Sequence, residues 1–153
     1  MSEALKIICE NRKARFDYHI EERMEAGVVL TGTEIKSLRG GKANLNDAYA
    51  TINNGEAWLM QAHIAPYDKG GYVNHEPKQR RKLLLHTKEI AKLYGKTQIR
   101  GYALIPMKIY FKKGRAKIEL ALAVGKNSGD KREAIKKRET QREVSRALKS
   151  AKR

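Results

Sequence analysis

The most regular chemistry in this sequence is a series of cations in its last segment, DKREAIKKRETQREVSRALKSAKR. From Asp130 to Arg153 the segment holds ten Lys or Arg residues and four acidic residues, a net charge of +6. Arg138, Arg142 and Arg146 follow one another at intervals of four residues, which places them on one face of a helix. Guanidinium groups in such a row bind phosphate oxygens. The spacing therefore predicts a basic helix that binds a polyanion.

The same segment also indicates when this helix forms. Asp130 is positioned as an N-cap, and Glu133, three residues later, completes a capping box. Without a partner the like charges repel, and the weak apolar side with Val144 and Leu148 buries almost nothing. We therefore expect residues 126–153 to be disordered when free and helical once counter-charge is bound. A permanently solvated charged tail is the alternative.

An excess of positive charge extends over the whole chain. Its 153 residues include 33 basic and 17 acidic side chains, a net charge of +16, and the pI is near 10.0. This balance favours nucleic acid over a membrane surface as the partner, because membrane-surface helices usually carry a broad apolar face. The start, MSEALKIICE, has neither the pattern of a signal peptide nor that of a membrane span. We expect a cytoplasmic protein that does not bind membranes.

The sequence lacks the motifs of an enzyme or a metal site. Cys9 is the single cysteine, which excludes an internal disulfide and a cysteine-based zinc site. The four histidines show no HxxH or HExxH spacing. Lys96 and Thr97 follow a glycine, but Ile90 stands where a phosphate-binding loop needs its first glycine. We predict no catalytic residues, no metal and no cofactor.

The elements that must position these cations are mainly strands joined by turns. Residues 17–30 alternate polar and apolar side chains in part, and residues 97–124 are strand-like throughout, with a turn at Lys113. Asn54 and Gly55 can take the two positive φ values of a type I′ turn between two strand-like runs. The pattern therefore predicts antiparallel pairing through hairpins.

Two short helices are predicted between the strands. The first has Thr33 as N-cap and stops at Gly40, and the second has Thr87 as N-cap and stops at Gly95. About six strands with local connections favour a small closed antiparallel barrel over residues 1–125, because closure removes exposed sheet edges. A β-sandwich is the runner-up.

Among polyanions, RNA fits these elements best. Lys36 and Arg39 are three residues apart on one face of the first helix, where both can bind phosphate. A long polar loop, PYDKGGYVNHEPKQRRK, ends in a run of cations. Tyr18 lies among basic residues, where its ring can stack on a base. These features indicate recognition of a folded RNA by shape.

Five short motifs occur in a specific order: EAG, GTEIKSLR, GKAN, RKLLL and DKR. From about Asn11 to its end, the chain resembles the family of SsrA-binding proteins (small protein B, SmpB), the partners of bacterial transfer-messenger RNA (tmRNA, SsrA RNA). The resemblance implies an OB-fold-like antiparallel β-barrel that grips the tRNA-like domain of tmRNA. It also implies a tail that folds as a helix in the empty decoding site and mRNA channel of a stalled ribosome.

The resemblance further implies partners and site residues. The partners are tmRNA, the decoding centre and mRNA channel of the ribosome, and elongation factor Tu through the tmRNA complex; the protein catalyses no reaction. The RNA-binding residues expected in the barrel are Asn11, Lys13, Tyr18, Glu25, Glu34, Lys36, Arg39, Lys42, Arg81 and Lys82. The residues expected to bind the ribosome from the tail are Asp130, Lys131, Arg132, Lys136, Lys137, Arg138, Arg142 and Arg146.

Two other functions fit the same charge. One is a general translation protein of the OB type that binds ribosomal RNA directly, and the other is a basic protein of membrane surfaces. A barrel joined to a separately hinged cationic helix favours two successive RNA surfaces over either of these. Gly129 and Thr140 replace residues that can stack in some relatives, so we attribute no such contact to these positions.

Overall fold

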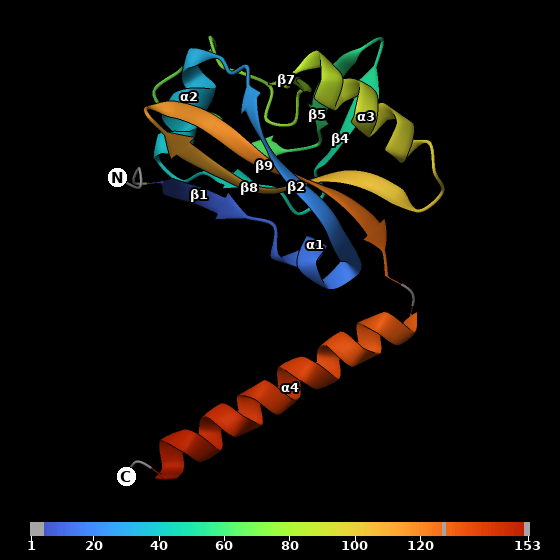
Figure 1. The fold of residues 1–153 in the computed structure, drawn as a ribbon. Coiled ribbons are helices and arrows are strands. Elements are labelled where there is room, and N and C mark those ends of the chain that lie inside the picture. Colours follow the sequence, from blue (N-terminus) through green and yellow to red (C-terminus); the bar gives the residue numbers. More distant parts are fainter. Residues whose placement is uncertain (1–4, 127, 152–153) are drawn as a thin grey trace.

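The structure is a computed structural model that describes residues 5–126 and 128–151, with side chains described for 5–126 and 136–149. Strands predominate, and a long helix follows them at the C-terminal end (Figure 1). In chain order the elements are β1 (Lys6–Glu10), α1 (Arg12–Asp17), β2 (Tyr18–Val28), α2 (Gly32–Arg39), β3 (Ala43–Asn44), β4 (Tyr49–Asn53), β5 (Glu56–Met60), β6 (His63–Ile64), β7 (Arg81–Leu84), α3 (Thr87–Thr97), β8 (Tyr102–Lys112), β9 (Arg115–Gly125) and α4 (Ser128–Ala151).

The main sheet closes on itself as an OB-like antiparallel barrel, as predicted. Its strand order is β1-β8-β4-β5-β7-β2-β9, and β9 pairs in turn with β8. The ring therefore runs from β8 through β4, β5, β7 and β2 to β9, with β1 added at β8. The seam between β4 and β8 is short, with Ala50 opposite Leu104. The sandwich alternative is wrong because β8 and β9, at the two ends of this series of strands, pair with each other and close the sheet.

The barrel core follows from alternation in β9. Ile118, Leu120 and Leu122 point inward and are fully buried, as their period of two predicts. The intervening Ala121 and Ala123 are buried as well, because they pack in a second cluster with residues of α1 and β8. The outer face of this strand is therefore buried as well at Ala121 and Ala123. Small alanine side chains allow α1 to lie close to the outside of the sheet.

Both predicted tight turns are confirmed. Asn54 and Gly55 have φ values of 52° and 75° between β4 and β5. Lys113 and Gly114 have φ values of 52° and 74° between β8 and β9. Two successive positive φ angles match the right-handed twist of the flanking strands, which is why such pairs favour short hairpins.

The helix α2 begins two residues earlier than predicted. Its N-cap is Thr31, not Thr33, and the Thr31 hydroxyl accepts a hydrogen bond from the Glu34 backbone N–H at 3.4 Å. In return, the Glu34 carboxylate accepts one from the Thr31 backbone N–H at 2.8 Å. The pair forms a capping box, whose Thr-x-x-Glu spacing is present in the sequence.

The ends of α3 also differ from the prediction. Its N-cap is His86, not Thr87, and the Glu89 carboxylate accepts a hydrogen bond from the His86 backbone N–H at 3.2 Å. It continues through Gly95 to Thr97. Gly95 is therefore a residue of the helix, and the buried Leu93 anchors this amphipathic helix on the barrel.

The elements β1 and α1 were missed from the sequence. Neither is long enough to show a periodic pattern, since β1 has five residues and α1 has six. The strand β1 is stabilised by pairing with β8. The residue that caps α1, Asn11, donates a hydrogen bond to the Pro106 carbonyl of β8, so both elements depend on residues that are distant in the sequence.

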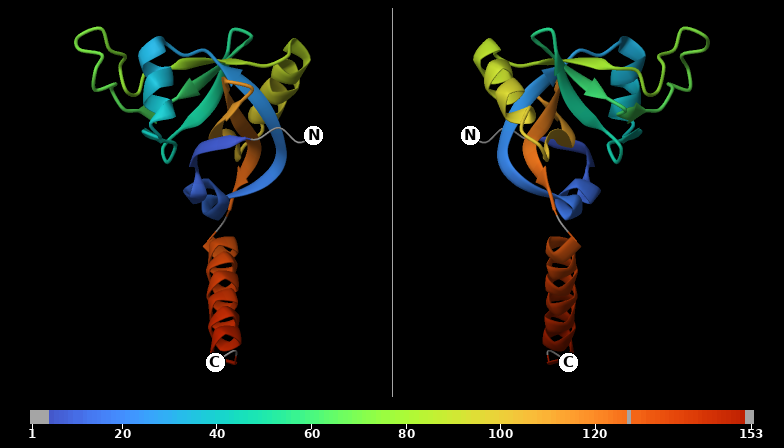
Figure 2. Two further views of the ribbon diagram at one scale, coloured as in Figure 1. Left: turned by 90° about the vertical axis from the view of Figure 1, so that its left-hand side faces the viewer. Right: turned by 90° about the vertical axis from the view of Figure 1, so that its right-hand side faces the viewer.

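The helix α4 projects from the barrel below α1 (Figures 1 and 2). It begins at Ser128, so Asp130 lies inside the first turn and its prediction as the N-cap is wrong. The side chains described from 136 to 149 are all exposed. The Arg138 guanidinium lies 5.8 Å from the centre of the Phe16 ring on α1. No helix in the described part of the chain is long and apolar enough to cross a membrane.

Candidate nucleic-acid interface

A basic surface is formed by α2 and the residues just after it. The buried Leu38 holds the helix on the core, and this orients Lys36 and Arg39 toward solvent. Lys42 is also exposed, and its Nζ lies 2.9 Å from a carboxylate oxygen of Asp68. We call Lys36, Arg39 and Lys42 the α2 basic surface. The helix pattern correctly predicted that Lys36 and Arg39 share an exposed face.

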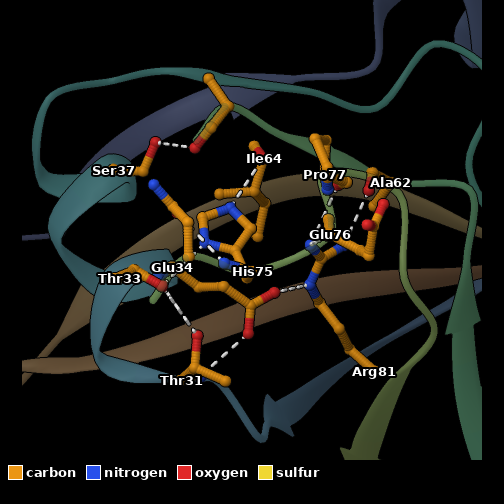
Figure 3. A network of polar contacts seen from close by, with 12 residues as sticks. Thr31, Thr33, Glu34, Ser37, Ala62, Ile64, His75, Glu76, Pro77 and Arg81 are labelled. Carbon is orange, nitrogen blue, oxygen red and sulfur yellow. Dashed lines mark hydrogen bonds and ion pairs between the residues drawn. The ribbon is translucent and has the colours of Figure 1, made fainter. Parts of the chain in front are cut away.

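A long loop, residues 65–80, connects β6 to β7, and hydrogen bonds attach it to α2. His75 lies between the two, with Nδ1 2.9 Å from the Thr33 hydroxyl oxygen and Nε2 2.9 Å from the Ile64 carbonyl oxygen (Figure 3). A carbonyl oxygen can accept but not donate, so Nε2 carries the proton and Nδ1 accepts from Thr33. His75 therefore connects the loop to the helix with a defined tautomer.

An ion pair between Glu34 and Arg81 lies at the centre of this network (Figure 3). Each residue is 1% exposed. Arg81 Nε donates to the Glu34 carboxylate, and Arg81 also donates to the carbonyls of Ala62 at 2.7 Å and Pro77 at 3.0 Å. In this structure the two side chains contact groups inside the protein and not the solvent, so an RNA contact by either of them stays a prediction. They position α2, β7 and the long loop.

The buried pair carries its charges at neutral pH. Burial of the Glu34 carboxyl would by itself raise its pKa, but the Thr31 backbone N–H and the Arg81 guanidinium oppose this effect, and the pKa lies below its ordinary value. No buried polar side-chain atom in the described residues lacks a hydrogen-bond partner. The network therefore meets the condition under which a buried ion pair is stable.

Asn11 is also an internal residue. It is 2% exposed, and its Nδ2 donates to the carbonyls of Leu45 and Pro106, each at 3.1 Å. Its Oδ1 accepts from the Ala14 backbone N–H at 3.1 Å, which caps α1. Each polar atom of its side chain is therefore engaged inside the protein, and an RNA contact by Asn11 stays a prediction. Lys13 on the same helix remains exposed.

A second surface lies on the other side of β7, where a groove of 670 Å³ runs between β2, β7 and the start of α3. We call it the β2–β7 groove. Glu25 and Lys82 line it, as do Leu84 and Lys117, which sequence reasoning did not select. The available signal for Lys117 was alternation, since it precedes the inward-facing Ile118 in β9. The exposure of Leu84 had no such signal.

The carboxylate of Glu25 already has partners at the edge of this groove. It accepts a hydrogen bond from the Tyr110 hydroxyl at 2.5 Å, and Lys112 Nζ lies 3.5 Å away. The Tyr110 hydroxyl is the main reason why the pKa of Glu25 is lowered, and Lys112 adds to the effect. Glu25 is thus ionised and oriented by Tyr110, with the Lys112 ammonium beside it.

The structure separates the predicted site residues into several places. Lys36, Arg39 and Lys42 form one surface, while Glu25 and Lys82 belong to the groove. The Lys82 Nζ lies 3.2 Å from the Glu56 carboxylate.

Other predicted residues lie toward the opposite end of the barrel and in the tail. Tyr18 is half-buried and packs with the second cluster near α1. Exposed on α4 are Lys136, Lys137, Arg138, Arg142 and Arg146. Asp130, Lys131 and Arg132 belong to α4, but their side chains fall outside the described residues. In the part of the chain that the structure describes, no group of three or more potential metal ligands is found.

An OB-like barrel with cations on one helix face, joined to a basic helix, defines a nucleic-acid-binding protein. The family model described as SmpB protein matches residues 8–150. The chain belongs to the SmpB protein family. This result confirms the resemblance that the five motifs indicated.

The curated relatives and a solved structure agree with this assignment. The SsrA-binding protein of Desulforudis audaxviator (strain MP104C) is 60% identical over 142 residues, covering 93% of this chain and 93% of that relative. The SsrA-binding protein of Desulfitobacterium hafniense (strain Y51) is 57% identical over 145 residues, covering 95% and 93%. A solved structure described as "tmRNA-SmpB: a journey to the center of the bacterial ribosome" is 48% identical, with a TM-score of 0.68 and coverage of 83% of this chain and 93% of its own.

Proposed function

We propose that the protein binds the tRNA-like domain of tmRNA and delivers it to stalled ribosomes for trans-translation. The observation that carries this proposal is the α2 basic surface, held rigidly on the barrel by the buried Glu34–Arg81 network in a chain of the SmpB family. A preorganised set of exposed cations binds phosphates at positions fixed by the fold, so it selects RNA by shape. The β2–β7 groove, which Lys82 and Lys117 line, offers a second basic surface for the same RNA.

The chain has two working units in this proposal. Residues 1–125 form the RNA-binding barrel, and residues 126–153 form the tail that enters the empty decoding site and mRNA channel. Arg138, Arg142 and Arg146 present cations along one side of α4, as ribosomal RNA binding requires. The protein acts in the cytoplasm by binding and positioning, without catalysis. It meets elongation factor Tu through the tmRNA complex.

A competition titration tests this function against direct, general binding of ribosomal RNA. Labelled tRNA-like domain of tmRNA is bound by the protein at two salt concentrations and challenged with excess ordinary tRNA and with ribosomal RNA fragments. We expect a preference for tmRNA that persists at the higher salt, since shape recognition does not depend on charge alone. Equal competition that disappears with salt would identify a general polyanion binder.

Removal of two cations from α2 should weaken RNA binding and reduce its salt dependence. For Lys36→Ala/Arg39→Ala we expect the slope of log K against log salt to fall by up to about two, because about 0.9 counterion is released per phosphate contact. The matched control is Lys96→Ala/Arg100→Ala, which removes the same charge from exposed positions at the end of α3. If both variants change the slope equally, net charge and not the α2 basic surface determines binding.

A further inference from the structure

The tip of the long loop presents apolar side chains to solvent in a highly charged protein. Tyr72 is 102% exposed and Val73 is 76% exposed, the two highest values among the large hydrophobic residues described as exposed. Such a side chain gains nothing for folding where it stands. Exposed aromatic rings beside cations are a feature of surfaces that bind unpaired bases.

The turn that carries Tyr72 is closed by hydrogen bonds. The Asn74 Nδ2 donates to the Tyr67 carbonyl at 2.8 Å, and its Oδ1 accepts from the Tyr67 backbone N–H at 3.2 Å. The Gly70 backbone N–H donates to the same carbonyl at 2.9 Å. A Cβ atom on Gly70 would lie 2.8 Å from Asn74 Nδ2, so a larger residue there would displace the Asn74 side chain that closes the turn. Gly71, with φ of +58°, has a backbone conformation that glycine adopts without strain and other residues rarely adopt.

The base of the same loop is attached to the α2 basic surface. Lys36 Nζ lies 5.4 Å from the centre of the Tyr67 ring, and Lys42 forms its ion pair with Asp68. His75 connects the other arm of the loop to α2. Figure 2 shows the loop extending outward past α2, away from the barrel. The tip is therefore held at a defined place beside the phosphate-binding cations.

We propose that Tyr72 stacks on an unpaired base of the RNA whose phosphates contact the α2 basic surface. The inference rests on the proposed function and adds a base-contacting group to it. RNA is the occupant that the charges favour, because Lys69 and Lys78 are exposed on the loop and Lys36 and Arg39 are exposed on α2 at its base. An unpaired nucleotide offers the flat face of its base to the ring and its phosphate to these cations. Preorganisation of the loop lowers the entropy that stacking costs.

The test compares Tyr72→Ala with Tyr72→Phe in the full chain, titrated with the tRNA-like domain of tmRNA at several salt concentrations. We expect Tyr72→Ala to bind about 5- to 150-fold more weakly, the range for loss of one stacked base, with an unchanged salt slope. Tyr72→Phe should bind like the unmodified protein because its ring still stacks. Tyr94→Ala, which removes an exposed tyrosine from α3, is the matched control and should leave affinity unchanged.

Three results would overturn the stacking proposal. They are unchanged affinity for Tyr72→Ala, equal losses for Tyr72→Ala and Tyr72→Phe, which would indicate a hydroxyl contact, and a loss accompanied by a lower salt slope. The proposed function has a separate readout. If Lys36→Ala/Arg39→Ala weakens binding while Tyr72→Ala does not, the RNA surface stands and the stacking contact does not; if neither does, both are wrong.

Discussion

Replacement of Arg81 by methionine is expected to lower the free energy of unfolding by about 3 to 5 kcal/mol, the usual cost of removing one partner of a buried ion pair. The substitution leaves the Glu34 carboxylate in the interior without its counter-charge. It also removes the donors that satisfy the carbonyls of Ala62 and Pro77. Both effects act on the network that holds α2, β7 and the long loop together.

Denaturant unfolding followed by circular dichroism measures this change. The control is Lys82→Met at the next residue, whose exposed ion pair with Glu56 contributes less than about 1 kcal/mol. The double variant Glu34→Leu/Arg81→Met should recover a large part of the loss, since no unpaired charge remains buried. A loss below about 1 kcal/mol for Arg81→Met would show that water reaches Glu34 and that the network does not hold the site.

The effect of Arg81→Met should also depend on pH in a defined direction. In the unmodified protein the pKa of Glu34 lies below its ordinary value of 4.5, so the pair stabilises the fold above that pH and the contribution disappears as pH falls through the lowered pKa. Without Arg81, burial dominates and raises the pKa of Glu34. In the variant, protonation therefore removes the buried negative charge at a higher pH than in the unmodified protein. The stability difference between the two proteins should therefore narrow as the pH is lowered toward 4.5.

Deletion of residues 130–153 is expected to abolish tagging on stalled ribosomes, a loss of at least about 100-fold, while binding to tmRNA changes by less than about threefold. The reason is spatial separation. The α2 basic surface and the β2–β7 groove belong to the barrel, whereas α4 projects away from it (Figure 1). The deleted segment also carries a net charge of +6, so a small loss of non-specific affinity is expected at low salt.

The measurements are a binding titration with tmRNA and an in vitro tagging assay on ribosomes stalled on truncated messages. A full-length control replaces Arg138, Arg142 and Arg146 by glutamine, which keeps the helix but removes three cations from one face. We expect this variant to bind tmRNA normally and to tag poorly. Collapse of tmRNA binding on deletion would contradict the division into two units, and normal tagging would remove the tail from the ribosomal step.

The sequence by itself was sufficient for features that depend on neighbouring residues. The period of two in β9, the turn at Asn54 and Gly55, and the spacing of Lys36 and Arg39 each predicted what the structure shows. The motif order also led to the correct family. These are local signals, because strand alternation, turn geometry and helix faces are determined over a few residues.

Tertiary structure alone decided which polar side chains are buried and which are exposed. Asn11, Glu34 and Arg81 have the same chemistry whether buried or exposed, and the partners that bury them lie far along the chain, 47 residues apart for Glu34 and Arg81. The capping of α1 also depends on tertiary packing, since a hydrogen bond to β8 holds its N-cap residue Asn11 in place. Burial is the sum of contacts between distant segments, so a pattern read over neighbouring residues identified the cations of the surface but not the polar groups that hold them in place.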